Sequence, residues 1–148
     1  LPLAGDGWLR ARVAVAFAST FDVGALLAWV DERRWAKLCF ERLPDGSQAV
    51  VSVVNRGRSD DATGFAVAAA AIDLRIARLD GALAFHASPD GRRWRLVRYF
   101  ELGALDGLRI GRARPAPAGA GRSAGPPTSR CCNRPRRRHR RGAGPRRE

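Results

Sequence analysis

Side chains that could bind a ligand recur at every second position of one short apolar segment. Trp35, Lys37, Cys39 and Glu41 alternate with a purely apolar set, Ala36, Leu38 and Phe40. Because successive side chains of a β-strand point to opposite faces, the apolar set belongs to a core and the other set shares one outward face. An aromatic ring, an ammonium group and a carboxylate on one face can stack on and hydrogen-bond a sugar ring. The other interpretation is a solvated sheet face with a cross-strand pair between Lys37 and Glu41.

Two residues outside that segment are further candidates for ligand contact. His86 is the only histidine of residues 1–111, and a lone histidine cannot build a zinc site. No Ser or Cys motif supplies a nucleophile for it to activate, so we expect a structural or ligand-contact role for His86 rather than acid–base catalysis. Arg98 adds a hydrogen-bond donor. The predicted ligand-binding set is therefore Trp35, Lys37, Glu41, His86 and Arg98.

The sequence gives little sign of a catalytic site or a metal site. A glycosidase needs two carboxylates about 5 to 10 Å apart across a cleft, and the predicted strand that carries Glu41 holds no second carboxylate. We therefore predict neither enzyme activity nor a cofactor. Asp60 and Asp61 could join backbone carbonyls in holding calcium, but they lack a DxDxDG pattern. Adjacent acidic residues in a loop are usually solvated or cap a turn.

The order of apolar residues and turns predicts an all-β fold. Period-two alternation dominates over the 3.6-residue period of a helix, and Asp-Gly steps, which favour tight turns, precede predicted strands at positions 45, 80, 90 and 106. Residues 56–64 are polar and predict a loop, and residues 65–71 fit either a strand or one helical turn. The predicted strands are 8–17, 23–30, 35–42, 48–55, 72–77, 83–87, 94–100 and 108–111. Repeated short strands of this kind indicate an antiparallel β-sandwich or barrel.

The net charge of +13 is concentrated at one end of the chain. Residues 1–111 carry 15 basic and 13 acidic side chains, whereas residues 112–148 carry 12 arginines and one glutamate, with no Leu, Ile, Val, Phe, Tyr or Trp. A segment without these residues cannot bury enough apolar surface to offset its conformational entropy. We therefore divide the chain into a β-sandwich domain, residues 1–111, and a disordered basic tail, residues 112–148. The tail would bind nucleic acid only non-specifically, through its arginine run.

Cysteine usage and hydropathy bear on location. Cys39 is the one cysteine of the domain, and the adjacent Cys131 and Cys132 suggest neither a disulfide framework nor a zinc site. The sequence has no apolar run of 18 residues and does not open with a signal peptide, although Leu1 in place of Met allows for an upstream segment. We expect a reducing, cytoplasmic location and no membrane contact.

Long colinear blocks of the chain resemble a known family. They are FDVGALLAWVDERRWAKLCFE at 21–41, VVSVV at 50–54, Ser-Asp-Asp at 59–61 and AFHASPDGRRWRLVRYF at 84–100. With these blocks, most of residues 21–111 resembles the bacterial DUF 1349 family, a domain of unknown function in the concanavalin A-like lectin/glucanase superfamily. That family is similar to the accessory sandwich of some β-xylosidases. The resemblance implies a jelly roll of two curved antiparallel sheets, whose concave face binds sugars in many superfamily members, and it implies no established activity.

Both ends of the chain differ from the pattern of that family. Its members usually carry further strands before the position of Leu1, and after the position of Gly111 they continue with a small-residue segment and a closing strand that ends in a Phe-Asp type motif. This chain instead runs into arginine, proline, alanine and glycine. Because GC-rich codons translated out of frame give these four residues, we interpret the tail as a frameshift product and the sandwich as incomplete at both ends.

The sequence as a whole favours a non-catalytic β-sandwich that binds a carbohydrate or small molecule weakly. Two alternatives stay open. One is a glycoside-hydrolase-related enzyme or its accessory domain, which would need a second acid supplied by segments outside this chain. The other is a protein that binds nucleic acid non-specifically through its tail.

Overall fold

The computed structural model describes residues 1–18 and 22–113. Within these residues the chain forms nine β-strands and no helix. In chain order, the strands are β1 (Gly7–Ala14), β2 (Val23–Asp31), β3 (Arg34–Arg42), β4 (Gln48–Arg56), β5 (Ser59–Ala66), β6 (Ala71–Leu79), β7 (Ala82–Ser88), β8 (Arg95–Phe100) and β9 (Arg109–Ala113).

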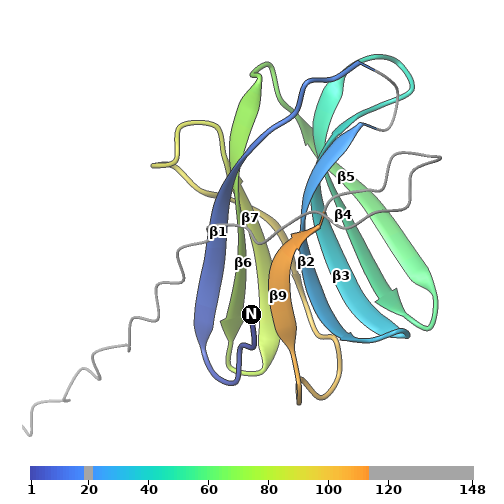
Figure 1. Cartoon of the computed structure of the whole chain (residues 1–148), viewed down its shortest axis with the longest axis vertical. Helices are drawn as coiled ribbons and strands as arrows, with labels where there is room; N and C mark the ends of the chain where they lie inside the picture. The colour runs from blue at the N-terminus through green and yellow to red at the C-terminus, as the bar shows by residue number, and fades with distance from the viewer. Residues whose placement is uncertain (19–21, 114–148) are drawn as a thin grey trace, which may run out of the picture.

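The strands form two antiparallel sheets that pack face to face (Figure 1). One sheet has four strands in the order β1-β6-β7-β8, and the other has five in the order β5-β4-β3-β2-β9. β1 therefore pairs with β6 rather than with its chain neighbour, and β9 returns to lie beside β2. The predicted all-β antiparallel sandwich is confirmed. Each sheet has one face toward the other sheet and one face outward, and the outward faces matter for function.

Tight turns at the Asp-Gly steps join strands where the sequence predicts them. The glycines of all four steps have a positive φ, between 70° and 84°, a region that other residues enter only at a steric cost. Three of these steps lie in the β3–β4, β6–β7 and β7–β8 hairpins, and the fourth precedes β9. The chemistry of the turns thus fixes the register of the hairpins on which the outward faces depend.

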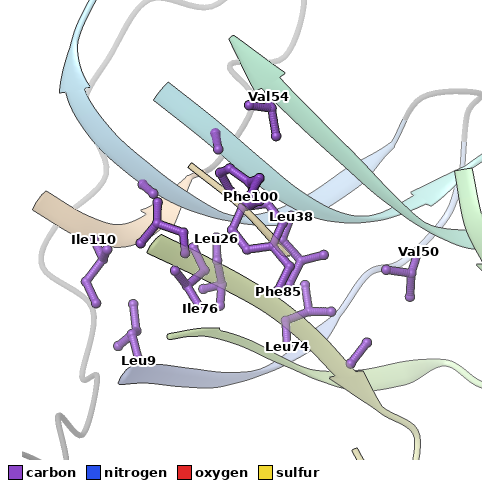
Figure 2. Packing of buried hydrophobic residues seen from close by; sticks show 14 of the residues in the cluster. Leu9, Leu26, Leu38, Val50, Val54, Leu74, Ile76, Phe85, Phe100 and Ile110 are labelled. Carbon is purple, nitrogen blue, oxygen red and sulfur yellow. The ribbon is translucent and has the colours of Figure 1, made fainter. Parts of the chain in front are cut away.

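The core fills the space between the two sheets (Figure 2). Its fully buried side chains come from both sheets, and Phe85 of β7 meets Phe100 of β8 edge to face with 4.8 Å between ring centroids. On β3 the core-facing set is the predicted one, Ala36, Leu38 and Phe40. In the segment predicted as the first strand, Leu9 and Val13 belong to the core cluster. Three partly buried residues of the same segment pack against it: Ala11, Val15 and Phe17.

The structure differs from the sequence-based prediction mainly at β5. Residues 59–64, predicted as part of a loop, belong to this edge strand, which pairs with β4. Six successive β5 residues are exposed, so no apolar alternation marks the strand, and the valine-rich β4 provides the hydrogen-bonding partner instead. Residues 67–70, for which a strand or a helical turn was predicted, form neither. The last strand continues past the predicted end at Gly111 to Ala113.

The basic tail lies almost entirely outside the described residues. Of residues 112–148, only Arg112 and Ala113 are described, and both belong to β9. The predictions of a disordered, frameshifted or nucleic-acid-binding tail therefore concern a part of the chain to which the structure does not extend. Across 1–18 and 22–113, no long apolar helix of the kind that spans a bilayer is present.

Candidate functional site

The outward face of the five-stranded sheet carries a pair of tryptophans. Trp29 of β2 and Trp35 of β3 are direct partners in the strand register, and Asn55 of β4 and Arg109 of β9 continue the same row on either side. Both indoles are partly exposed. Residues that pair directly across antiparallel strands bring their Cβ atoms to within about 5.5 Å, so the two rings are neighbours on one surface. We call the outward surface formed by Trp29, Trp35, Lys37, Glu41 and Asp61 the tryptophan face.

Charged side chains lie on the same outward face as the tryptophan pair. Lys37 pairs with Val53, and Val53 pairs with Asp61 of β5, so the ammonium and this carboxylate lie on the same row of the sheet. Burial raises the pKa of Glu41, while the charge of Lys37 opposes that shift and the charge of Asp61 adds to it. The tryptophan face therefore combines aromatic surface with both hydrogen-bond donors and acceptors.

Small apolar residues form the floor between these groups. Cys39, Ala25, Ala49 and Val51 make a second apolar cluster on the outward side, separate from the main core. Burial raises the pKa of the Cys39 thiol to about 12, so the thiol stays protonated near neutral pH and is a poor nucleophile. The floor is thus shaped for packing rather than for covalent chemistry.

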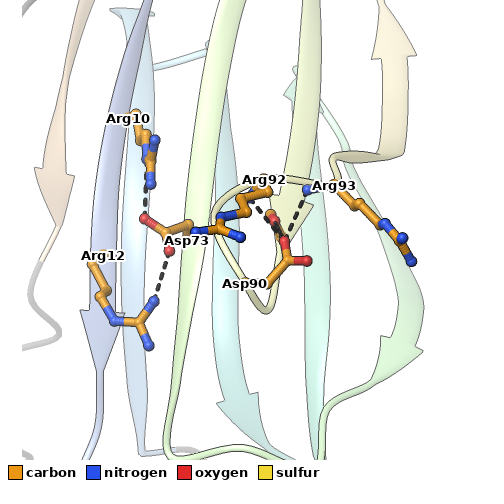
Figure 3. Close-up of polar contacts among 7 residues, drawn as sticks. Arg10, Arg12, Asp73, Asp90, Arg92 and Arg93 are labelled. Carbon is orange, nitrogen blue, oxygen red and sulfur yellow. Dashed lines mark hydrogen bonds and ion pairs between the residues drawn. The ribbon is translucent and has the colours of Figure 1, made fainter.

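The outward face of the four-stranded sheet carries a different group, which we call the arginine cluster: Arg10, Arg12, Asp73, Arg75, His86 and Trp94. Asp73 is 2% exposed and accepts hydrogen bonds from Arg10 Nε at 3.0 Å and from Arg12 at 2.8 Å, as Figure 3 shows. Arg10 is the register partner of Arg75, which in turn pairs with His86. The three strands β1, β6 and β7 therefore place three guanidinium groups, one imidazole and the Asp73 carboxylate on neighbouring rows of one face.

The loop between β7 and β8 supplies the ring of the arginine cluster. Asp90 accepts hydrogen bonds from the backbone N–H groups of Arg92 and Arg93, both at 2.8 Å, and from the Ser88 hydroxyl at 2.9 Å (Figure 3). These bonds lower the pKa of Asp90 to about 2. The loop ends at Trp94, whose ring centroid lies 4.3 Å from the Arg75 guanidinium carbon and 5.2 Å from that of Arg10.

The predicted ligand-binding residues lie at three places. Trp35, Lys37 and Glu41 come together on the tryptophan face, as their alternation predicts. His86 belongs to the arginine cluster, on the outward face of the other sheet. Arg98 lies between the sheets at the β5–β8 edge, where its guanidinium pairs with the Asp60 carboxylate and donates to the Asp60 carbonyl at 3.2 Å. The structure therefore does not gather these five residues into one site.

The two adjacent acids of β5 point in opposite directions. Asp60 turns toward the other sheet and pairs with Arg98, whereas Asp61 lies on the outward row with Val53. Within residues 1–18 and 22–113, no three His, Cys, Asp or Glu side chains come close enough together to hold a metal ion.

A cavity of about 710 Å³ lies where the β2–β3 turn, the β4–β5 turn and residues 102–103 meet. Its wall includes Arg34, whose guanidinium is held by Asp31 at 2.7 Å and donates to the Ala104 carbonyl at 2.9 Å. The polar groups of Arg34 are thus already bonded within the protein, and we place no function in this cavity.

Three features of these faces were missed by reasoning from the sequence. Trp29 lies opposite Trp35 because the register shifts between Trp29 and Asp31, and counting back from the turn without that irregularity would place Val30 there instead. Asp61 could not be placed because its strand was taken for a loop. The arginine cluster depends on the pairing of β1 with β6. These strands are more than 50 residues apart, and no local sequence pattern predicts that they pair.

Comparison with known proteins supports the fold. The sequence profile of a family described as "Protein of unknown function (DUF1349)" matches residues 1–125. A functionally unknown protein from Saccharomyces cerevisiae is similar in structure, with a TM-score of 0.69 and 26% identity over 76% of this chain. No curated protein matches the sequence.

Parts of two bacterial proteins are similar as well. The GH43 BlXynB protein from Bacillus licheniformis has a TM-score of 0.61 at 13% identity over 72% of this chain. The xylan β-1,4-xylosidase from Bacillus halodurans has a TM-score of 0.62 at 12% identity over 73%. This chain spans 60% of the yeast protein but only 23% and 24% of the two bacterial proteins. At these identities the bacterial structures show a shared fold, and that fold is consistent with a concanavalin A-like sandwich.

Proposed function

We propose that this chain, which belongs to the DUF1349 family of proteins of unknown function, is a non-catalytic carbohydrate-binding module that holds a pyranose ring on its tryptophan face. The observation that carries the proposal is the direct register pairing of Trp29 with Trp35 on an outward surface. Aromatic side chains that remain partly exposed side by side on a sheet give a flat apolar platform, and the C–H face of a pyranose is itself flat and apolar.

The surroundings of the platform suit a neutral sugar. A sugar needs both donors and acceptors for its hydroxyls, and Lys37 and Asp61 supply them on the row next to the tryptophan pair. Glu41 lies six residues along β3 from Trp35, about 20 Å at the rise of a strand, so it would contact only a longer oligosaccharide. Burial raises the pKa of Glu41 above its ordinary value, so its carboxyl is partly withdrawn from solvent on this face. Cys39 and its small apolar neighbours project little from the sheet, so they leave room for a ligand between the larger side chains.

The fold gives a reason to test plant-type saccharides first. A GH43 protein and a xylan β-1,4-xylosidase each contain a part similar to this chain, although that part accounts for only about a quarter of each protein. Xylo-oligosaccharides are therefore the first probes, with cello-oligosaccharides and glucose as neutral comparisons.

The experiment is isothermal titration calorimetry of the full chain with these saccharides, repeated with Trp35→Ala. We expect a dissociation constant below about 1 mM, which corresponds to about −4 kcal/mol. Loss of one stacking ring should weaken binding by about two- to ten-fold, since an aromatic contact contributes about 0.5–1.5 kcal/mol.

Trp8→Ala is the matched control, because Trp8 lies on the outward side of the four-stranded sheet. It should leave saccharide affinity within about two-fold of the wild-type value. Equal weakening by both substitutions, or no saturable binding of any saccharide, would contradict the proposal. Slow hydrolysis of a saccharide that Glu41→Gln abolishes would instead favour the enzyme alternative, with Asp61 as the second acid.

A further inference from the structure

We propose that the arginine cluster is a second binding site, specific for an oxyanion, in which the Arg75 guanidinium holds a carboxylate or phosphate group of a small ligand between Arg10 and His86. This inference is independent of the proposed carbohydrate site, because the two sites lie on the outward faces of different sheets.

The first argument is a charge imbalance. Arg10, Arg12 and Arg75 face one carboxylate, that of Asp73, and both ion-pair contacts of Asp73 go to Arg10 and Arg12. Among residues 1–18 and 22–113, no carboxylate forms an ion pair with Arg75. Arg75 is also the direct register partner of Arg10, and like charges at such positions repel each other. An anion bound between them would remove this repulsion.

The second argument is the pair of nitrogens left without partners. Arg75 Nε and His86 Nδ1 are both buried and have no hydrogen-bond partner in the described part of the chain. A buried polar atom without a partner costs about 1–3 kcal/mol, so two of them on neighbouring residues call for an explanation. Because Arg75 and His86 are register partners and both side chains are partly exposed, an oxyanion held by the Arg75 guanidinium would lie beside the His86 ring.

The third argument is that the cluster is held in place before any ligand arrives. Trp94 stacks against Arg75 at 4.3 Å, and Asp73 fixes Arg10 and Arg12 through its two oxygens. A β-carbon at Gly91 would approach an Arg10 guanidinium nitrogen to 2.6 Å, so this glycine lets the loop close over the cluster. A guanidinium already fixed by stacking loses less conformational freedom on binding a planar carboxylate or a phosphate.

Exposed apolar side chains beside the cluster could contact the rest of the ligand. Leu96 pairs with His86 in the register and Tyr99 pairs with Ala84 one row away, and each is 59% exposed. A ligand with an acidic group and an apolar ring face fits this arrangement, and D-glucuronate is the simplest probe of that kind. Inorganic phosphate tests the oxyanion alone.

The experiment is titration of the full chain with D-glucuronate, inorganic phosphate and, as the neutral counterpart of glucuronate, D-glucose, at constant ionic strength. Because tail arginines also attract anions, the readout specific to the cluster is the His86 ring, followed by NMR. Burial and the Arg75 charge lower the pKa of His86 in the free protein. A bound anion should therefore raise it, whereas Asp73, Arg10 and Arg12 keep their mutual contacts.

Saturable binding of glucuronate or phosphate with an upward shift of the His86 pKa supports the site. Whether glucuronate or phosphate binds then shows whether the site takes a carboxylate or a phosphate group. Arg75→Gln should weaken binding at least about ten-fold and Arg75→Lys by less, because lysine keeps the charge but lacks the two-pronged donor. Arg58→Gln, which removes an exposed charge at the β4–β5 turn, should change affinity less than about two-fold. An unchanged His86 pKa at saturating anion, or equal losses in Arg75→Gln and Arg58→Gln, would overturn the proposal.

Discussion

The two outward faces of the sandwich each carry two of the four tryptophans, but their surroundings differ in kind. On the five-stranded sheet, Trp29 and Trp35 lie side by side above small apolar residues, with charges of both signs nearby. On the four-stranded sheet, Trp94 lies against two guanidiniums, and arginines outnumber acids. One fold thus presents an aromatic platform on one side and a cationic cluster on the other.

The difference shows how an antiparallel sandwich separates stability from recognition. Alternation commits every second residue to the core, and the remaining positions are free to vary without disturbing the packing. Which outward residues become neighbours is then decided by strand order. A ligand face is therefore a property of the register across strands, and a single strand shows only one row of it.

The largest expected effect is on the core that both faces share. Phe85→Ala should lower the free energy of unfolding by about 3–5 kcal/mol, because Phe85 is fully buried and packs edge to face against Phe100. Tyr99→Ala, in the neighbouring strand but exposed, should change it by less than about 1 kcal/mol. Urea denaturation of both variants measures the contrast, and similar losses would mean that the β7–β8 hairpin does not point Phe85 inward.

Next in size is the effect of removing the one buried carboxylate of the arginine cluster. Asp73→Asn should cost about 2–3 kcal/mol, because it leaves Arg10 and Arg12 without their charged partner, while both arginines remain partly solvated. Asp61→Asn on the tryptophan face should cost less than about 0.5 kcal/mol, since Asp61 is exposed. If the same denaturation experiment gave equal losses for the two substitutions, the distinct roles of the two faces would be wrong.

A smaller effect should appear as a pH dependence at Asp90. Its hydrogen bonds to the β7–β8 loop lower its pKa from 3.8 to about 2, so the folded state releases this proton more readily than the unfolded chain. The stability that Asp90 contributes is therefore full above about pH 4 and is lost as the pH falls toward 2. The difference in melting temperature between wild type and Asp90→Asn should shrink over this interval, and NMR titration of the Asp90 carboxyl should give the low midpoint. A midpoint near 4 would exclude the loop geometry described.

The smallest effect concerns Glu41 and has the opposite sign. Burial raises the pKa of Glu41, so its charge is slightly unfavourable in the folded state, and its contribution to stability falls as the pH rises through its folded pKa. Glu41→Gln should therefore raise stability near pH 7 by less than about 1 kcal/mol after solvent screening, and the gain should vanish near pH 3. A loss of stability at pH 7 would show that Lys37 stabilises the carboxylate more than burial opposes it.

Much of the fold could be predicted from local sequence. Alternation on β3 correctly separates the core set from Trp35, Lys37 and Glu41, and the four Asp-Gly steps give turns with positive φ. The edge strand β5 escaped prediction because exposed strands need no apolar pattern. Because β5 was not predicted, the sequence also did not show that the charge of Asp61 acts on the pKa of Glu41.

The candidate sites could be predicted only in part. Trp35, Lys37 and Glu41 belong to one strand, and local alternation suffices to group them. His86 and Arg98 were grouped with them although His86 lies on the other sheet and Arg98 is bonded to Asp60 between the sheets. Assigning them requires knowing that the strands β6, β7 and β8 form a sheet with β1, separate from the sheet that contains β3, and no local pattern shows which sheet a hairpin joins.

The most direct test of the two-face account is the indole N–H region of an NMR spectrum, because the four tryptophans divide two and two between the faces. Titration with a xylo-oligosaccharide should shift the Trp29 and Trp35 signals and leave Trp8 and Trp94 in place. Titration with glucuronate or phosphate should shift Trp94 instead. Movement of Trp8 and Trp94 by the neutral saccharide, with Trp29 and Trp35 unaffected, would contradict the account.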